Sequence, residues 1–238
     1  MGGEEAGEEG VSDFATRRAA ARARLDAIDP HVRPGGREAD PLRRDWFEAV
    51  YELAAGDPAG VPWANLEPHP LLADWLSSQG ALEGLRALDV GCGLGDNAQA
   101  LAEKGARVTA FDLVAKAVDW AKRRFPASPV DYRAADLFAL PKEWRGAFDL
   151  VHECYTLQAL PESLLPQAAQ ALAATIAPQG RLLVVARARG DEQEVAGPPW
   201  PLTRRQIEAL AADGLRLETL QELPTERGPH WRALLRRE

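Results

Sequence analysis

Three glycines and two carboxylates stand close together at residues 88–96, in the run Leu-Asp-Val-Gly-Cys-Gly-Leu-Gly-Asp. Gly91, Gly93 and Gly95 alternate with other residues, and each lets a ligand approach the backbone because glycine carries no Cβ atom. Asp89 precedes the glycines and Asp96 follows them. The spacing predicts a ligand-binding turn between a strand and a helix, flanked by negative charge.

The charge of this turn indicates which ligand it favours. A dinucleotide-binding turn reads Gly-x-Gly-x-x-Gly and holds a pyrophosphate at the start of a helix, but the sixth position here is Asp96. The carboxylates at 89 and 96 repel phosphate, whereas they attract a cofactor that has no phosphate and carries an ammonium and a sulfonium. S-adenosyl-L-methionine is such a cofactor.

Two further carboxylates follow predicted strands. Asp112 lies 17 residues beyond Gly95, where a carboxylate can accept hydrogen bonds from both hydroxyls of a ribose. Nicotinamide enzymes share this spacing, so it supports the cofactor only together with the glycine turn. Asp136 follows the third strand and is predicted to accept from an adenine amino group, with the apolar Leu113 and Leu137 beside the ring. The alternative role for Asp136 is to cap a local turn.

These residues need a scaffold that brings several strand ends to one edge. From residue 85 onward, short β-branched or apolar runs alternate with amphipathic runs, which is typical of a parallel sheet covered by helices on both faces. We expect strands at 86–90, 107–111, 130–132, 148–152, 181–186, 216–220 and 231–235. We expect four helices in this region. The first has Asp96 as its N-cap, and the second spans 115–124. The third has Leu164, Ala168, Leu172 and Ile176 on one face, and the fourth opens at a Thr203–Gln206 capping box.

Together these features resemble the class I S-adenosylmethionine-dependent methyltransferases, over roughly residues 85–188. The resemblance implies an α/β fold, with a Rossmann-like, seven-stranded, mostly parallel sheet whose final strand is reversed, plus an N-terminal helical extension. It also implies that Gly91, Gly93 and Gly95 face the methionine part of S-adenosyl-L-methionine, Asp112 the ribose and Asp136 the adenine. The expected activity is therefore methyl transfer.

The fourth predicted strand ends in His-Glu-Cys-Tyr at 152–155, where the family places residues beside the transferred methyl. Glu153 is the candidate for a polar contact there and the one candidate catalytic residue, and Tyr155 is a candidate for the acceptor site. His152 points to the opposite side from Glu153 because side chains alternate along a strand. Alignment supplies most of the rate of an in-line methyl transfer, so a general base is needed only when the nucleophile carries a proton.

Aromatic residues and an arginine are predicted to line the acceptor side. A narrower likeness, to the thiopurine methyltransferase group, rests on the segment from Trp46 to Trp63 and on the Gly-Pro-Pro-Trp run that ends at Trp200. The loop at 187–202 is long for a strand-to-helix connection, so we expect it to act as a lid. Trp200 would anchor this lid and Arg187 would meet an anionic substrate group. Simple core packing is the alternative for the tryptophans.

Composition narrows the partners. The chain has 238 residues, a net charge of −8 and two cysteines. Negative charge repels phosphate backbones, so we expect a small-molecule methyl acceptor and no nucleic acid. The cysteines fit no metal-ligand pattern, so no metal site is expected. Without a long apolar run or a signal-peptide pattern, the chain is expected to be cytoplasmic, off the membrane, and a monomer or homodimer.

Three segments are expected along the chain. Residues 1–39 would form a flexible N-terminal arm and linker, with an unfolded tail at 1–10 and a helix at 13–28. Residues 40–80 would form a helical lid segment, with Trp46, Phe47, Val50 and Leu53 on one face. Residues 81–238 would form the S-adenosylmethionine-binding methyltransferase domain.

Two other functions remain open. A nicotinamide-dependent oxidoreductase shares the Asp112 spacing, but the turn lacks its last glycine and the chain lacks a Tyr-x-x-x-Lys or comparable catalytic pair. The alternative from a different class is a protein that binds S-adenosylmethionine as a sensor or structural group without turnover, since methyl transfer demands no diagnostic triad.

Overall fold

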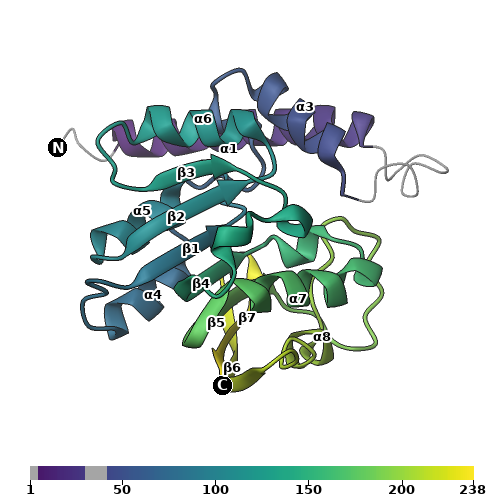
Figure 1. Cartoon of the computed structure of the whole chain (residues 1–238). Helices are drawn as coiled ribbons and strands as arrows, with labels where there is room; N and C mark the ends of the chain where they lie inside the picture. Colours follow the sequence, from purple (N-terminus) through teal and green to yellow (C-terminus); the bar gives the residue numbers. More distant parts are fainter. Residues whose placement is uncertain (1–4, 30–41) are drawn as a thin grey trace. The chain divides into compact units, whose positions relative to one another are not determined.

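The computed structural model describes residues 5–29 and 42–238, with side chains from residue 13 onward (Figure 1). The chain divides into two compact units, Met1–Leu66 and Glu67–Glu238. Residues 30–41 of the expected linker lie outside the described residues. Among the helices that are described, none has both the length and the apolar character required to cross a membrane.

A seven-stranded sheet forms the centre of the second unit, in the order β3-β2-β1-β4-β5-β7-β6 (Figure 1). β7 pairs antiparallel with β5 and β6, and the other neighbours pair in parallel. The mostly parallel, Rossmann-like sheet with a reversed final strand is therefore confirmed. Its strands are β1 (Arg86–Val90), β2 (Arg107–Asp112), β3 (Asp131–Ala134), β4 (Phe148–Cys154), β5 (Ile176–Arg187), β6 (Leu215–Thr225) and β7 (Gly228–Arg237).

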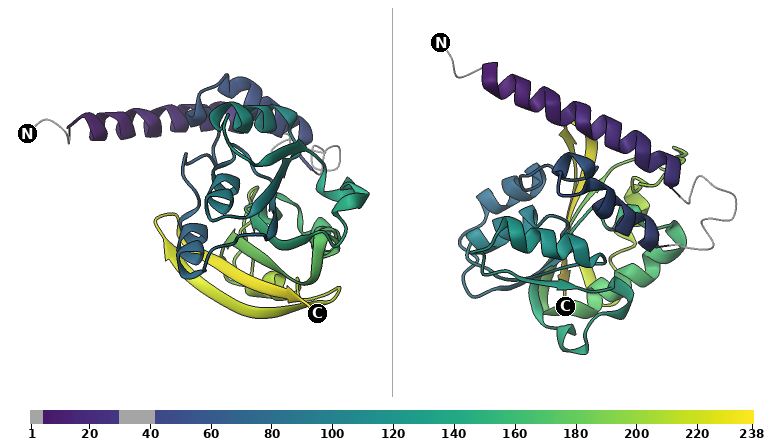
Figure 2. Two further views of the ribbon diagram at one scale, coloured as in Figure 1. Left: turned by 60° about the vertical axis from the view of Figure 1, so that its left-hand side comes forward. Right: turned by 90° about the horizontal axis from the view of Figure 1, so that it is seen from above.

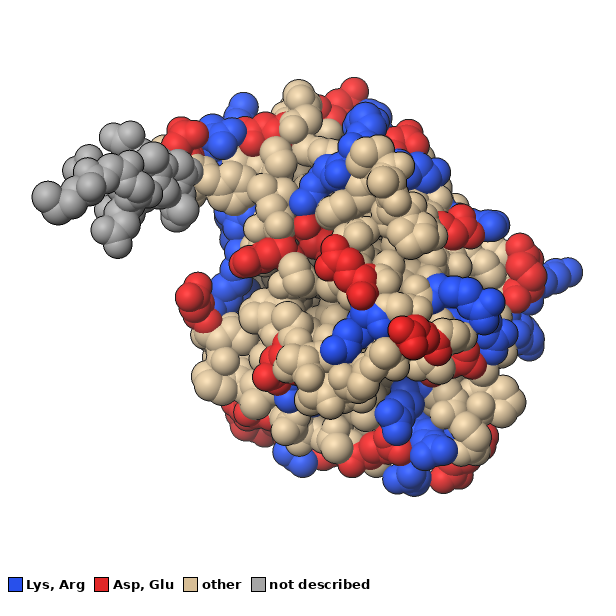
Figure 3. All heavy atoms as spheres, turned by 90° about the vertical axis from the view of Figure 1, so that its left-hand side faces the viewer, with Lys and Arg blue, Asp and Glu red and all other residues tan. Residues whose placement is uncertain are grey.

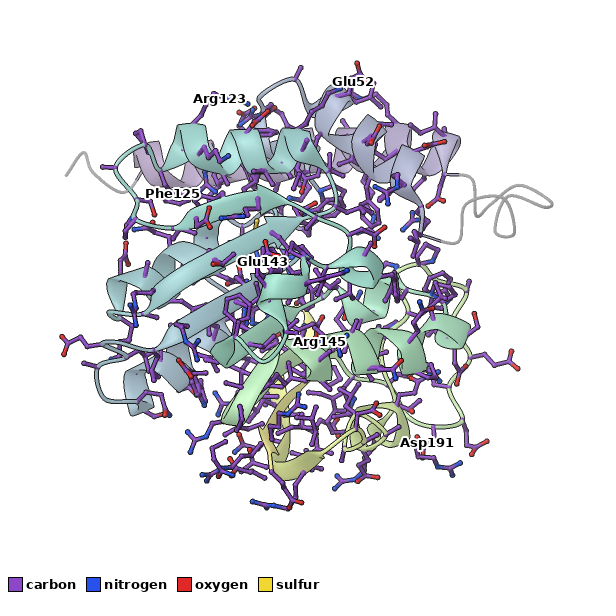
Figure 4. The ribbon with its side chains drawn as sticks, in the orientation of Figure 1. Glu52, Arg123, Phe125, Glu143, Arg145 and Asp191 are labelled. Atoms are coloured by element: carbon purple, nitrogen blue, oxygen red, sulfur yellow. The ribbon has the colours of Figure 1, made fainter. Side chains whose placement is uncertain are left out.

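Helices cover both faces of this sheet (Figure 2). One apolar core joins the sheet to α4 (Pro70–Ser78), α5 (Asp96–Glu103) and α6 (Ala115–Arg124). The other face carries α7 (Leu165–Thr175) and α8 (Arg204–Glu208), and the expected capping box opens α8. α6 has the bounds that the sequence predicts. It is amphipathic, because its buried Val118 and Ala121 share one face whereas Arg123 points away from the sheet (Figure 4).

The second half of the sheet differs from the prediction in its boundaries. Ile176 was expected on the helix face, but α7 ends at Thr175 and Ile176 begins β5, where it pairs with Phe148. A helix cannot continue smoothly towards Pro178, because proline disfavours the helical conformation of the residue before it. β6 and β7 are also longer than expected and form an extended hairpin (Figure 2).

The first unit contains α1 (Glu5–Ile28), α3 (Arg44–Ala54) and the short η2 (Pro58–Gly60). α1 begins at Glu5, so the expected tail is helical from residue 5, and the helix starts earlier than the predicted residue 13. In α3, Trp46 and Val50 are buried as expected, but Leu53 is 56% exposed and Ala54 is buried instead. The buried stripe centres on positions four residues apart, so Leu53 lies at its rim.

Candidate functional site

The glycine turn joins β1 to α5, as the sequence predicts. Gly91 has φ +65°, and a Cβ atom added there would lie 2.3 Å from Oγ1 of Thr156. Gly95 has φ +91°, and its Cβ would lie 2.7 Å from Oη of Tyr132. At both positions glycine is required for two reasons: the backbone is left-handed, and a neighbouring side chain occupies the space that a Cβ atom would need.

Asp96 does not cap α5, so this prediction is wrong. The N-cap is Gly95 in the left-handed conformation, and Asp96 is the first residue of the helix. Its two carboxylate oxygens each accept a hydrogen bond of 2.7 Å from the guanidinium of Arg124, which also donates to the carbonyl of Leu94. The ion pair offsets the negative charge that the sequence assigns to this end of the turn and holds α5 against the end of α6.

Asp112 binds the glycine turn directly. Its Oδ2 accepts from the N–H of Gly93 at 2.9 Å, and its Oδ1 accepts from the N–H of Val114 at 2.9 Å. Burial raises the pKa of this carboxyl to about 6, against the lowering effect of these hydrogen bonds. Leu113, which lies between Asp112 and Val114 in the sequence, is half-buried. Asp112 therefore shapes the turn, and its contact with a ribose stays a prediction.

Asp89 lies buried beneath the turn and faces the neighbouring strand. Its Oδ1 is 2.7 Å from Nδ1 of His152, which lies opposite it on β4 and is fully buried. Among the described residues, Oδ2 of Asp89 has no hydrogen-bond partner. The protein thus leaves one buried acceptor beside the glycine turn without a donor.

Asp136 caps the turn that follows β3. Its Oδ1 accepts from the N–H of Phe138 at 2.9 Å, at the start of η3 (Leu137–Ala139). Leu137 itself is buried. The capping role that the sequence left as an alternative is therefore observed, and the contact of Asp136 and Leu137 with adenine stays a prediction.

Glu153 holds the turn after β4. It is fully buried, and its Oε1 accepts from the N–H of Leu157 at 2.8 Å, whereas Oε2 has no partner among the described residues. Burial raises the pKa of this carboxyl to about 7. In the same turn, Oγ1 of Thr156 donates to the carbonyl of Val90 at 3.2 Å. The observed contacts of Glu153 are those of a positioning residue, and its contact with a transferred methyl stays a prediction.

The raised pKa of Glu153 predicts how its substitution depends on pH. Burial raises this pKa from 4.5 to about 7, so folding takes up a proton between these values and the contribution of Glu153 to stability is lost as the pH rises through about 7. Glu153→Gln keeps the acceptor for Leu157 and removes the charge. We compare the unfolding free energy of the variant with that of wild type at each pH. We expect this difference to favour the variant by on the order of 1–3 kcal/mol more at about pH 8 than at about pH 4. Urea unfolding at both pH values measures this, and an equal difference at both contradicts it.

Tyr155 lies between two histidines that the sequence did not single out. Its Oη is 3.0 Å from Nε2 of His69 and 2.6 Å from Nε2 of His230. His69 precedes α4, and His230 lies on β7 opposite Arg187. No spacing pattern joins positions so far apart along the chain; only the order of the strands brings them to the carboxyl edge of β4 and β5.

The expected lid, residues 187–202, is fixed to the same edge. The N–H groups of Arg187 and Trp200 each donate to Gln158 at 2.7 Å, one to its side-chain oxygen and one to its carbonyl. Gln158 lies in η5 (Leu157–Ala159), directly after the turn that holds Tyr155. Trp200 is half-buried, and its ring lies over Gly197. The contacts of Arg187 and Trp200 with an acceptor stay predictions.

Trp46 and Trp63 pack in the first unit. The Trp46 ring lies 3.8 Å from the guanidinium carbon of Arg43, and its Nε1 donates to the carbonyl of Leu25 at 3.4 Å. Trp63 donates to Oη of Tyr51 at 3.2 Å, and the two indole rings lie 6.1 Å apart. These are core contacts of the N-terminal unit, and the substrate role of both tryptophans stays a prediction.

Comparison with known proteins agrees with this geometry. Residues 87–180 match the family described as a methyltransferase domain. A ubiquinone biosynthesis O-methyltransferase of Chromobacterium violaceum is 37% identical over 98 residues, which are 40% of this chain and 42% of that protein. The chain spans about half the length of the curated relatives it matches.

Solved structures share the fold at low identity. One, described as "Conversion of a Disulfide Bond into a Thioacetal Group during Echinomycin Biosynthesis", has a TM-score of 0.68 and 22% identity over 82% of this chain and 92% of that one. Another is the Burkholderia thailandensis 1,6-didemethyltoxoflavin-N1-methyltransferase with bound S-adenosylhomocysteine, with a TM-score of 0.65 and 19% identity over 84% and 89% of the two chains.

The family match over residues 87–180, the strand order and the glycine turn support the resemblance of the second unit to the class I S-adenosylmethionine-dependent methyltransferases. This match is to the methyltransferase domain family. The reported relative is a ubiquinone biosynthesis enzyme. The narrower likeness to the thiopurine methyltransferase group stays a prediction.

Proposed function

We propose that this chain transfers the methyl group of S-adenosyl-L-methionine to a small-molecule acceptor by direct in-line displacement. The observation that carries the proposal is the glycine turn held against a carboxylate at the end of β1, where the N–H of Gly93 donates to Asp112 at 2.9 Å. A turn of this kind leaves backbone open to a ligand at the end of β1, beside an acceptor for hydroxyl donors.

The residues present fit the cofactor. Asp112 has lone pairs beyond the two that accept from Gly93 and Val114, so it can accept from ribose hydroxyls. The unpartnered Oδ2 of Asp89 provides a negative acceptor suited to an ammonium group. Asp136 and Leu137 follow β3 at the same edge and would contact the adenine. When bound, S-adenosyl-L-methionine supplies an electrophilic methyl on a cationic sulfur.

The comparisons support oxygen as the methylated atom. The curated relatives, of whose length this chain matches about half, are named O-methyltransferases. A structural neighbour under 25% identity, an N1-methyltransferase, supports the fold alone. On the face shown in Figure 3, basic and acidic side chains are interspersed, which agrees with a small acceptor better than with a polyanion.

The direct experiment offers methyl-labelled S-adenosyl-L-methionine and a panel of phenols, amines, thiols and carboxylates to the full chain. We expect label in at least one class of acceptor, with phenols the first to test. Label in none of the four classes, despite saturable cofactor binding, would contradict methyl transfer and favour a protein that binds the cofactor without turnover.

A further inference from the structure

We propose that Tyr155 and His230 form the proton relay of the transfer reaction, with His69 orienting the tyrosine, so that the acceptor presents a hydroxyl group to Oη of Tyr155. This inference rests on the proposed function. It is carried by a line of three side chains, His69, Tyr155 and His230, joined at 3.0 Å and 2.6 Å at the carboxyl edge of the sheet.

The backbone partners assign every proton in this line. The N–H of Leu71 donates to Nδ1 of His69 at 3.2 Å, so the proton of the neutral His69 ring is on Nε2 and points to Tyr155. Nδ1 of His230 lies 2.9 Å from the carbonyl of Gly228 and 3.1 Å from Oγ1 of Thr225, and that hydroxyl donates its proton to the same carbonyl. Nδ1 of His230 therefore carries the ring proton, and Nε2 is free to accept. The hydroxyl of Tyr155 therefore donates to His230 and accepts from His69.

The surroundings of all three groups favour their neutral forms in the resting protein. Burial, together with the smaller effects of His230, His152 and Arg227, lowers the pKa of His69 to about 3. Burial also lowers the pKa of His230. Burial raises the pKa of Tyr155, so a free phenolate is disfavoured and a proton that arrives at Oη has to move on in the same step.

Tyr155 is the member of the line that a ligand can reach. His69 and His230 are buried, whereas Tyr155 is only half-buried and has a left-handed backbone with φ +71°. Such a conformation is costly for a residue with a Cβ atom and is uncommon for a residue as bulky as tyrosine. Of the two lone pairs on Oη, one accepts from His69 and the other is available to a hydroxyl.

The line is also tied to the cofactor turn at two points. The N–H of His69 donates to the side-chain oxygen of Asn97 at 2.8 Å, in the first turn of α5. Thr156, next to Tyr155, donates to the carbonyl of Val90 and fills the space beside Gly91. The two neighbours of Tyr155 are thus fixed to the two ends of the glycine turn, His69 at the α5 end and Thr156 at the β1 end. This turn would bind the methionine part of the cofactor.

The chemical step balances within these groups. The acceptor oxygen forms a bond to the methyl carbon as its proton passes to Oη of Tyr155, and the Tyr155 proton passes to Nε2 of His230. The methyl–sulfur bond breaks with its electron pair on sulfur, which becomes a neutral thioether. One positive charge moves from the sulfonium to the His230 imidazolium, whose Nδ1–H stays bonded to Gly228.

Nitrogen NMR of the histidine-labelled wild-type chain tests the proton assignment without any ligand. The chain has four histidines, which His→Gln variants assign one at a time. At about pH 7 we expect a neutral His69 ring protonated on Nε2 and a neutral His230 ring protonated on Nδ1. A charged ring at either position, or the reversed tautomers, would overturn the relay.

Kinetics of Tyr155→Phe test the chemistry, with catechol and 4-nitrocatechol as acceptors. At about pH 8 catechol keeps its proton and 4-nitrocatechol is ionised, so only catechol needs a base. We expect Tyr155→Phe to lower kcat about 100-fold with catechol but no more than about tenfold with 4-nitrocatechol. Its affinity for S-adenosylhomocysteine should stay within about twofold of wild type.

The other outcomes are also decisive. An equal loss with both catechols assigns Tyr155 a structural role and overturns the relay. If wild type binds S-adenosylhomocysteine but methylates neither catechol, the hydroxyl acceptor is overturned while the proposed function stands. If S-adenosylhomocysteine does not bind, the proposed function itself fails, which separates the two claims.

Discussion

Replacing Asp112 by asparagine is expected to weaken the binding of S-adenosylhomocysteine at least tenfold. The carboxylate would lose two charge-assisted hydrogen bonds to ribose, each worth about 1.5–3 kcal/mol, and an amide replaces only part of this. Asparagine also has one acceptor oxygen for the two N–H groups, of Gly93 and Val114, that Asp112 now satisfies. Calorimetric titration measures the affinity, and urea unfolding measures the accompanying loss of stability.

The pH dependence of binding separates the charge of Asp112 from its role in shaping the turn. Because burial raises its pKa to about 6, wild-type affinity should fall as the pH drops below that value, whereas Asp112→Asn should show no such fall. Asp131→Asn is the matched control, since Asp131 lies half-exposed on β3 and pairs with Arg133. We expect it to change affinity less than about twofold. Unchanged binding in Asp112→Asn would contradict the ribose assignment.

Adding one methyl group at Gly91 is expected to be among the most damaging changes to the fold around the site. Alanine there costs about 1–2 kcal/mol for the left-handed backbone. Its Cβ would also lie 2.3 Å from Oγ1 of Thr156, an overlap that costs roughly a further 1–3 kcal/mol if Thr156 is displaced. Movement of Thr156 would carry Tyr155 with it, so the acceptor side should suffer together with the turn.

A double-mutant cycle isolates the overlap. In Gly91→Ala/Thr156→Ala, the contact with Oγ1 is gone, so the double variant should be more stable than the sum of the single changes predicts. Gly84→Ala is the control, because Gly84 also has a left-handed backbone, with φ +81°, but nothing lies within 4 Å of the added Cβ. Urea unfolding of these variants is the measurement. A loss at Gly91 no larger than the loss at Gly84 would contradict the steric role of Thr156.

Local patterns predicted the features of the fold that depend on neighbouring residues. The glycine turn, the helix Ala115–Arg124 and the capping box at Thr203 all arise from residues close in sequence, and all three are confirmed. Asp96 was misassigned because a left-handed glycine can take the N-cap position, and Asp96 then meets Arg124, which lies one strand and one helix further along the chain.

The candidate site was only partly predictable, for a topological reason. Tyr155 was singled out by its place after a strand, but His69 and His230 join it through the pairing of β5 with β7 and the position of α4. Glu153 was singled out for the same reason as Tyr155. Its hydrogen bond to Leu157 depends on how the following turn folds back, which the residue types alone do not show.

Calorimetric titration of the full chain with S-adenosylhomocysteine and, separately, with NAD tests the central claim most directly. We expect saturable binding of one S-adenosylhomocysteine per chain and no binding of NAD, since the turn has Asp96 where a pyrophosphate-binding turn has glycine, and Asp89 lies buried beneath it. No binding of S-adenosylhomocysteine, or binding of NAD that is equally tight, would contradict the assignment of the glycine turn and Asp112 to S-adenosyl-L-methionine.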